Sequence, residues 1–156
     1  IIGDDVIIKS FSYLEGVNIK KGVTIGPFAR IRPESNIGEN SKVGNFVELK
    51  NANVADNVKI SHLSYIGDAS LGSGTNIGAG TITCNFDGVE KYKTIIGKNA
   101  FIGSNSSLIA PIEISDNSYI GSGSVITKDV PTNSLSLSRS EQVTKNNWVK
   151  KRSTKK

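Results

Sequence analysis

The stretch IGKNAFIGSNSSLIAPIEISDNSYIGSGSVI, residues 96–126, carries an aliphatic residue at every sixth position. These positions are occupied by Ile96, Ile102, Leu108, Ile114, Ile120 and Ile126. An α-helix repeats about every 3.6 residues and a single strand every two, so neither produces this spacing. A coil of three short strands does produce it, because one aliphatic side chain per strand fills the interior and about 18 residues close one triangular turn.

The same six-residue frame extends through most of the chain. With a few five-residue steps it continues as Ile2, Ile8, Leu14, Ile19, Ile25, Ile31, Ile37, Val43, Leu49, Val54, Ile60, Ile66, Leu71 and Ile77. Ten of the sixteen glycines directly follow a frame residue, where we expect glycine to help the chain turn a corner. The pattern predicts an all-β parallel β-helix of about seven coils over residues 2–131. A β-sandwich would instead show alternation of period two, which this sequence lacks.

The charge of the chain is concentrated at its C-terminal end. The net charge is +5, but residues 145–156 hold six of the nineteen Lys and Arg residues and no acidic residue. The remainder carries thirteen basic and fourteen acidic residues, for a net charge of −1. A neutral body argues against nucleic acid as its partner. The basic tail is compatible with a solvated irregular end, with contact to an anionic cofactor, or with a nucleic-acid or membrane surface.

Cysteine content and hydropathy predict a cytoplasmic protein. Cys84 is the only cysteine, which excludes an internal disulfide and fits a reducing compartment. No apolar run approaches the length of about 18 residues that a membrane span requires, and the start does not resemble a signal peptide. The chain opens at Ile1 rather than at a methionine, which is compatible with a piece of a longer protein.

Stacking the frame places the only histidine, His62, in a column of outward positions. If each coil has three faces, Ile25, Val43, Ile60, Ile77, Ile102 and Ile120 share one face. Two residues after each of them come Pro27, Asn45, His62, Ala79, Ser104 and Ser122. We therefore expect His62 to lie beside Ala79, one coil away. A structural histidine bonded to its neighbours is the alternative interpretation of this position.

A second cluster begins at the corner that leads into the next face, whose frame residues are Ile31, Leu49, Ile66 and Thr83. This corner collects Arg30, Arg32, Glu48, Lys50 and Tyr65. The repeat then breaks at CNFDGVEKYKT, residues 84–94, which we expect to leave the same corner as a loop carrying Asn85, Lys91 and Lys93. Converging cations suit a phosphate or carboxylate ligand. A solvated charged rim is the alternative.

Several motifs resemble one enzyme family. They are GPFARIRP (26–33), VGNFVELK (43–50), SHLSYIGD (61–68), NIGAGTITCNFDG (76–88), KYKTIIG (91–97) and the late SRSEQ and Trp148. Together they are similar to the acetyltransferase domain of the bacterial bifunctional N-acetylglucosamine-1-phosphate uridyltransferase/glucosamine-1-phosphate N-acetyltransferase. The resemblance covers the chain from about residue 20 to the tail. It implies a left-handed β-helix over residues 1–133, with the loop at 84–94, and an irregular basic tail over 134–156.

The resemblance also implies an activity, its substrates and an assembly. Acetyl-CoA would donate an acetyl group to the amine of glucosamine 1-phosphate, on the route to UDP-N-acetylglucosamine, peptidoglycan and lipopolysaccharide. The active sites would lie between the subunits of a homotrimer. No metal, nucleic acid or membrane would take part. The nucleotidyltransferase domain of the family is absent from this chain, so we do not expect it to make UDP-sugars alone.

Site residues follow from matching motifs to the family. His62 would be the general base. Substrate-binding residues would be Arg32, Lys50, Tyr65, Asn76, Asn85 and Lys91. The Ala79 N–H would face the thioester carbonyl, and the rest of CoA would lie along Ser104, Ser122 and Arg139. Two positions depart from the family pattern: Phe86 stands where tyrosine is expected, and Ser122 stands where alanine is expected.

The proposed reaction needs one base, which this sequence can supply. An ammonium group cannot attack a thioester, and histidine can accept a proton near neutral pH. A backbone N–H one coil away can stabilise the oxyanion. Glu48 is a candidate to orient His62. The alternatives are an acyltransferase for another amino sugar or for a hydroxyl, and a noncatalytic scaffold, which would need neither the loop nor the basic cluster.

Overall fold

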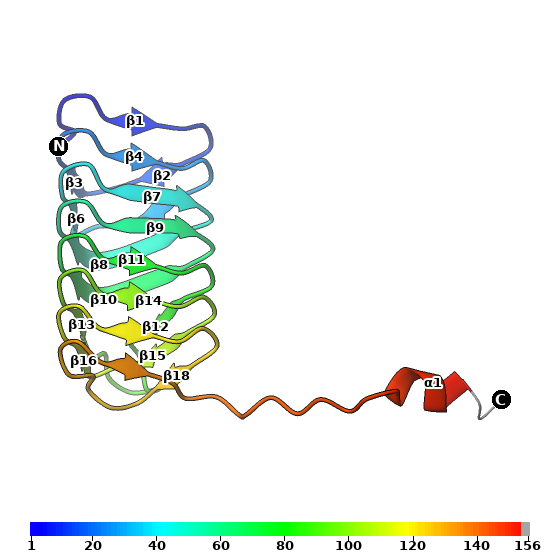
Figure 1. Cartoon of the computed structure of the whole chain (residues 1–156). Helices are drawn as coiled ribbons and strands as arrows, with labels where there is room; N and C mark the ends of the chain where they lie inside the picture. The colour runs from blue at the N-terminus through cyan, green and yellow to red at the C-terminus, as the bar shows by residue number, and fades with distance from the viewer. Residues whose placement is uncertain (154–156) are drawn as a thin grey trace.

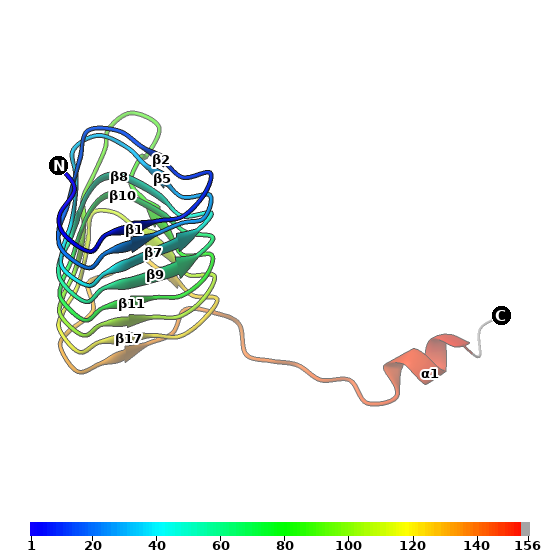
Figure 2. The ribbon, with the colours of Figure 1, turned by 90° about the horizontal axis from the view of Figure 1, so that it is seen from above.

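The computed structural model describes residues 1–153, which form a β-helix followed by a tail. Short parallel strands stack in a solenoid of about seven turns, and the expected left-handed β-helix is confirmed. Figure 1 shows the coils as successive rungs, with the tail leaving the last rung and running away from the body. Seen along the axis in Figure 2, each coil is a rounded triangle, so the molecule has three faces and three corners.

The first face is one parallel sheet running the length of the solenoid. It comprises β1 (Ile7–Ile8), β4 (Thr24–Ile25), β7 (Lys42–Asn45), β9 (Lys59–His62), β11 (Asn76–Ile77), β14 (Phe101–Ile102), β17 (Tyr119–Ile120) and β19 (Leu135–Ser136). Because β19 pairs with β17, the coils continue past residue 133, which the resemblance implies as the end of the β-helix.

The second and third faces share two long strands that bend through the corner between them. The second face comprises β2 (Tyr13–Leu14), β5 (Arg30–Ile31), the first halves of β8 (Glu48–Val54) and β10 (Tyr65–Leu71), β12 (Ile82–Cys84), β15 (Ser107–Ile109) and β18 (Val125–Ile126). The third comprises β3 (Val17–Ile19), β6 (Ser35–Ile37), the second halves of β8 and β10, β13 (Thr94–Ile96) and β16 (Ile112–Ile114).

The register of the strands reproduces the columns expected from the six-residue frame. On the first face, Val43 pairs with Ile60, Ile60 with Ile77, and Ile77 with Ile102. Frame residues from Ile19 to Ile126 are buried and form the core. The first coil differs, because Ile2 and Ile8 have only one neighbouring coil and are 59% and 41% exposed.

The glycines after frame residues serve a different purpose from the one expected. Most of them do not take the left-handed backbone of a turn; that conformation is adopted at the corners by residues such as Asn40 and Asn57, with φ of 56° and 60°. A Cβ at Gly44 would instead collide with the carbonyl oxygen of Ser61 in the next coil. A Cβ at Gly78 would approach the Ser104 nitrogen to 2.5 Å. These glycines permit close stacking of coils rather than turning.

The excursion loop leaves the solenoid from a different corner than expected. The second face begins with Arg30, Glu48 and Tyr65 in register, and β12 crosses that face before the loop starts at Asn85. The loop therefore departs at the far end of the second face, where β8 and β10 bend at Asn51 and Asp68. It projects beyond the coils in Figure 2. The expectation was wrong because the strand segment 82–84 still occupies one face of its coil.

The tail contacts the body near residue 138. The Val125 N–H donates to the Ser138 carbonyl, and the Arg139 guanidinium donates to the Ser122 carbonyl at 3.1 Å. Beyond this point the chain is extended until the short helix α1 (Trp148–Ser153). No helix within residues 1–153 is long and apolar enough to cross a membrane.

Candidate functional site

His62 lies at the end of β9, at the corner between the first and second faces, with its side chain exposed. Its Nδ1 is 2.6 Å from Oδ1 of Asn45, the residue in register with it in the preceding coil. An amide oxygen only accepts hydrogen bonds, so Nδ1 carries the proton and Nε2 of the neutral ring is an acceptor. The arrangement leaves a basic nitrogen facing solvent. Glu48, the residue expected to orient His62, bonds to Arg32 instead.

A ladder of free backbone N–H groups continues from His62 along the same corner. The Gly80 N–H donates to the Leu63 carbonyl and the Asn105 N–H to the Ala79 carbonyl, which puts Ala79 one coil from His62, as expected. Among the described residues, no partner is found for the N–H of Ala79, Ser104 or Ser122. Three consecutive coils therefore offer donors to an acceptor from outside.

The second face carries the predicted substrate-binding residues Arg32, Lys50 and Tyr65. Arg32 and Glu48 form an ion pair at 3.2 Å, with side chains 41% and 32% exposed. Tyr65 opens β10 between Glu48 and Ile82 and is half-buried. The second face therefore lies between the corner with His62 and the corner where the excursion loop begins.

Asp68 organises the far corner of this face. Its Oδ1 accepts hydrogen bonds from Lys50 Nζ and Asn51 Nδ2, both at 2.8 Å. Its Oδ2 accepts from Lys50 Nζ at 2.8 Å and from Asn85 Nδ2. Burial alone would raise the pKa of Asp68, but the hydrogen bonds from Lys50, Asn51 and Asn85 and the charge of Lys50 outweigh it and hold that pKa below its usual value.

The excursion loop brings Asn85 to this corner but leaves Lys91 apart. Asn85 is 8% exposed and touches Asp68 at the root of the loop. Phe86 and Lys91 form an isolated antiparallel bridge, and Phe86 is 57% exposed. The side chain of Lys91 is exposed and makes no hydrogen bond or ion pair within the described part of the chain.

Two other predicted residues lie away from the second face. Asn76 opens β11 on the first face, in register with Lys59 and Phe101. Arg139 is on the tail and bonds to the Ser122 carbonyl, which joins two of the residues predicted to line CoA. One chain thus gathers Arg32, Lys50, Tyr65 and Asn85 on one face and the donors of Ala79, Ser104 and Ser122 along an adjacent corner, but it leaves Asn76 apart from both.

Sequence reasoning did not assign a role to Asp68 or Asn45. Asn45 stood in the same outward column as His62, so the column itself contained the signal. Asp68 falls in the motif SHLSYIGD, and it stands in one column with Asn51 and Asn85, two residues after frame residues, so this column also contained a signal. Only the contact from Lys50 crosses from the adjacent column. The φ of Asp68, 49° at the bend of β10, turns the carboxylate toward Lys50 and the loop.

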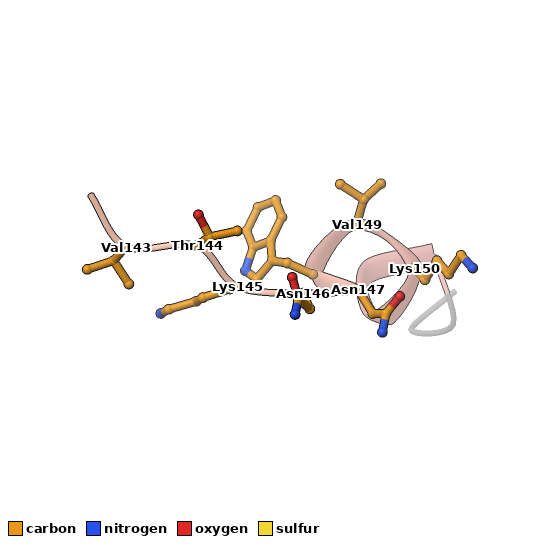
Figure 3. Close-up of a pocket in the computed structure, with 8 residues that line it drawn as sticks. Val143, Thr144, Lys145, Asn146, Asn147, Val149 and Lys150 are labelled. Atoms are coloured by element: carbon orange, nitrogen blue, oxygen red, sulfur yellow. The ribbon is translucent and has the colours of Figure 1, made fainter.

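One hollow lies away from the coils. Figure 3 shows the tail residues that line it, which are residues 143–150. It belongs to the extended tail and receives no residue from the coils. Within the described residues no group of three or more His, Cys, Asp and Glu side chains could hold a metal ion.

A triangular parallel β-helix with a polar face and a free-donor ladder defines a hexapeptide-repeat protein. The chain belongs to the GMPPB C-terminal domain family, whose sequence profile matches residues 13–112. It is 55% identical to "Bifunctional protein GlmU" of Acidithiobacillus ferrooxidans over 155 residues, which is 99% of this chain and 34% of that protein. It is 57% identical to the Rhizobium rhizogenes protein of the same name over 136 residues, or 87% of this chain and 30% of that protein.

The chain spans about a third of the length of these curated relatives and matches their C-terminal portion. The resemblance of the motifs to the acetyltransferase domain of the bifunctional family is thereby confirmed. Among solved structures, PerB from Caulobacter crescentus, in complex with CoA and GDP-perosamine, has a TM-score of 0.66 at 22% identity, covering 74% of this chain and 53% of that one. UDP-N-acetylglucosamine acyltransferase from Campylobacter jejuni has the same TM-score at 19% identity, covering 88% and 66%. These likenesses concern the fold.

Proposed function

We propose that the chain transfers the acetyl group of acetyl-CoA to the amine of glucosamine 1-phosphate. The observation that carries this proposal is His62, whose Nδ1 is fixed by Asn45 at 2.6 Å while the free N–H of Ala79 lies one coil away. A base beside an oxyanion donor is the minimum that amide formation from a thioester needs. The names of the curated relatives and the CoA complex of PerB support this activity.

The residues divide the chemistry between them. Nε2 of His62 takes a proton as the amine nitrogen forms its bond to the thioester carbon. The Ala79 N–H donates to the oxygen that becomes negative in the tetrahedral intermediate. When the carbon–sulfur bond breaks, the thiolate leaves and takes up the proton, giving free CoA and N-acetylglucosamine 1-phosphate. Histidine is suited to both halves of this transfer near neutral pH.

The second face supplies the binding site for the sugar phosphate in this proposal. Arg32, Lys50 and Lys91 bind the phosphate, because guanidinium and ammonium groups form charge-assisted hydrogen bonds with phosphate oxygens. Tyr65 and Asn76 hold the sugar, and Asn85 holds the end that carries the amine. CoA runs from Ala79 along Ser104 and Ser122, whose free N–H groups face outward, and reaches Arg139.

We further propose that the site is completed between chains of a homotrimer. Asn76 lies on the first face and Arg32, Lys50 and Tyr65 lie on the second, so one chain cannot enclose a sugar with all four. An exposed column of stacked rings, Phe11, Phe28 and Phe46, follows the corner between these faces and offers apolar area to a neighbour. Sedimentation equilibrium is expected to give the mass of three chains, and a monomer at assay concentration would contradict the assembly.

Domain organisation, location and pathway belong to the same proposal. The β-helix, which extends to β19, forms the body of a cytoplasmic acetyltransferase, and the basic tail beyond it adds contacts to CoA or to a neighbouring chain. The product would feed UDP-N-acetylglucosamine synthesis for peptidoglycan and lipopolysaccharide.

The test is a thiol-release assay with acetyl-CoA and a panel of matched acceptors. Glucosamine 1-phosphate is expected to give release well above background, and mass spectrometry of the product should show one acetyl group on nitrogen. Glucose 1-phosphate keeps the phosphate but replaces the amine by a hydroxyl, and glucosamine 6-phosphate moves the phosphate. Faster turnover with either analogue would identify a different acceptor. Background rates with every acceptor would support a noncatalytic scaffold.

A further inference from the structure

We propose that Asp68 is a positioning residue for this reaction, which holds Lys50 and Asn85 so that an ammonium N–H and an amide oxygen face the substrate. The inference rests on the proposed function. Asp68 does not face the substrate in this arrangement; it acts through the two side chains that do.

Asp68 and its partners come from three separate segments. Lys50 and Asn51 lie at the bend of β8, Asp68 lies at the bend of β10, and Asn85 is the first residue of the excursion loop. Asp68 is 7% exposed, and its ion pair with Lys50 is largely shielded, since the side chains are 8% and 19% exposed. A shielded carboxylate that accepts four hydrogen bonds from three side chains holds its neighbours more firmly than an ion pair in solvent does.

The hydrogen bonds to Asp68 determine which donors and acceptors of Lys50 and Asn85 remain available for a substrate. An ionised carboxylate only accepts hydrogen bonds, so Asn85 must turn its Nδ2 toward Asp68. The Asn85 Oδ1 then points away from Asp68 as an acceptor, which suits the protonated or neutral amine of an amino sugar. Lys50 has three N–H donors and directs Nζ at both oxygens of Asp68, so one donor remains for a phosphate oxygen.

The same geometry anchors the loop that carries Lys91. Asn85 stands where the chain leaves β12, and the Tyr92 N–H returns to the Asn85 carbonyl at 2.8 Å. Asp68 therefore fixes both the start of the loop and, through the Asn85 backbone, the strand that comes back. Removing the carboxylate has three effects at once. It frees Lys50, it removes the reason for the Asn85 amide to turn its Nδ2 toward position 68, and it loosens the root of the loop.

The test compares steady-state kinetics of the full chain and Asp68→Asn for both substrates. The KM for glucosamine 1-phosphate is expected to rise and kcat/KM for it to fall by roughly 10-fold to 10²-fold, as for outer-shell partners of other sites. The KM for acetyl-CoA should stay within about twofold, because the donors along Ala79, Ser104 and Ser122 are not touched. A purely structural role would affect both substrates alike.

Asp56→Asn is the matched control. Asp56 also sits at a bend of the solenoid, where its Oδ1 accepts the Glu39 N–H at 2.7 Å, but it contacts none of the predicted site residues. The same substitution there should leave both KM values and kcat unchanged. Coupling to Lys50 is measured by adding Lys50→Gln, where the combined loss should be smaller than the product of the single losses. If Asp68→Asn alone does not fold, the double variant Asp68→Asn with Lys50→Gln replaces it, because that variant has no unpaired buried charge. Its kinetics are then compared with those of Lys50→Gln.

The outcomes separate this inference from the proposed function. An active wild type whose Asp68→Asn variant has unchanged kinetics, equal losses for both substrates, or losses that multiply with Lys50→Gln contradicts the role of Asp68 alone. A wild type inactive with glucosamine 1-phosphate contradicts the proposed function, and the inference that rests on it falls too.

Discussion

The two corners of the second face are built in opposite ways. At the corner after the first face, His62 is exposed and has one side-chain partner, Asn45. At the corner before the third face, Asp68 is buried and Lys50, Asn51 and Asn85 all donate to it. The exposed corner leaves reactive groups free for something outside the chain. The side chains of the buried corner form most of their hydrogen bonds with one another, so their positions are fixed before a substrate binds.

This difference teaches which substitutions should affect folding and which should affect only chemistry. Breaking a shielded ion pair leaves an uncompensated charge that water cannot reach, which lowers the free energy of unfolding. Removing a solvent-facing imidazole costs the folded state little, while the proposed reaction loses its base. The same face should therefore yield variants of both kinds.

Lys50→Met is expected to have the largest effect on stability. It leaves the buried Asp68 carboxylate without a cation, which should lower the free energy of unfolding by about 3 kcal/mol. Urea denaturation followed by circular dichroism measures this change. The matched control is Lys21→Met, which breaks an exposed pair with Asp5 at 3.6 Å and should cost under about 0.5 kcal/mol. Equal losses in the two variants would show that the buried corner is not special.

His62→Ala should have the opposite signature. The acetyl-transfer rate is expected to fall by roughly 10²-fold or more, because the base is removed, while the urea midpoint stays that of the wild type. Lys59→Ala, an exposed change on the same strand β9, should leave the rate near the wild-type value. Unchanged turnover in His62→Ala would remove His62 from the mechanism.

The stability of the buried corner should also depend on pH in the acid range. The folded-state pKa of Asp68 lies below its usual value of 3.8, so its contribution is complete above that value and is lost as pH falls through the folded pKa. The difference in unfolding free energy between wild type and Asp68→Asn should be constant from about pH 7 to about pH 5 and shrink toward pH 3. A difference that grows on acidification would have the wrong sign for a carboxylate held ionised.

Phe86→Tyr is the smallest change that we predict. It restores the residue expected from the family at a side chain that is 57% exposed on the loop. Because Phe86 contacts neither His62 nor Asp68 through a polar group, kcat/KM for glucosamine 1-phosphate should change by less than about threefold. A larger gain would place the loop, rather than the second face, in control of acceptor binding.

The six-residue frame predicted the fold because each frame residue has the same task in every coil. Ile60 and Ile77 share a column as soon as the period and the three-faced coil are accepted, and His62 then lies one coil from Ala79. The same reasoning missed why Gly44 is a glycine, since the collision with Ser61 occurs between coils and depends on how closely they stack. It also put the loop at the wrong corner, because the width of a face is set by where strands such as β12 end.

By itself, the sequence determined the solenoid, the outward column of His62 and the resemblance that names candidate site residues, because all three depend on spacing along the chain. Only the tertiary structure decided that the Asn45 amide bonds to Nδ1 of His62 and that Asp68 joins Lys50 to the root of the loop. Those contacts link residues 17 or 18 positions apart across bends of different coils. A coil of 17 or 18 residues brings these positions together, but which atoms bond depends on side-chain orientation and, at Asp68, on a left-handed backbone with φ of 49°.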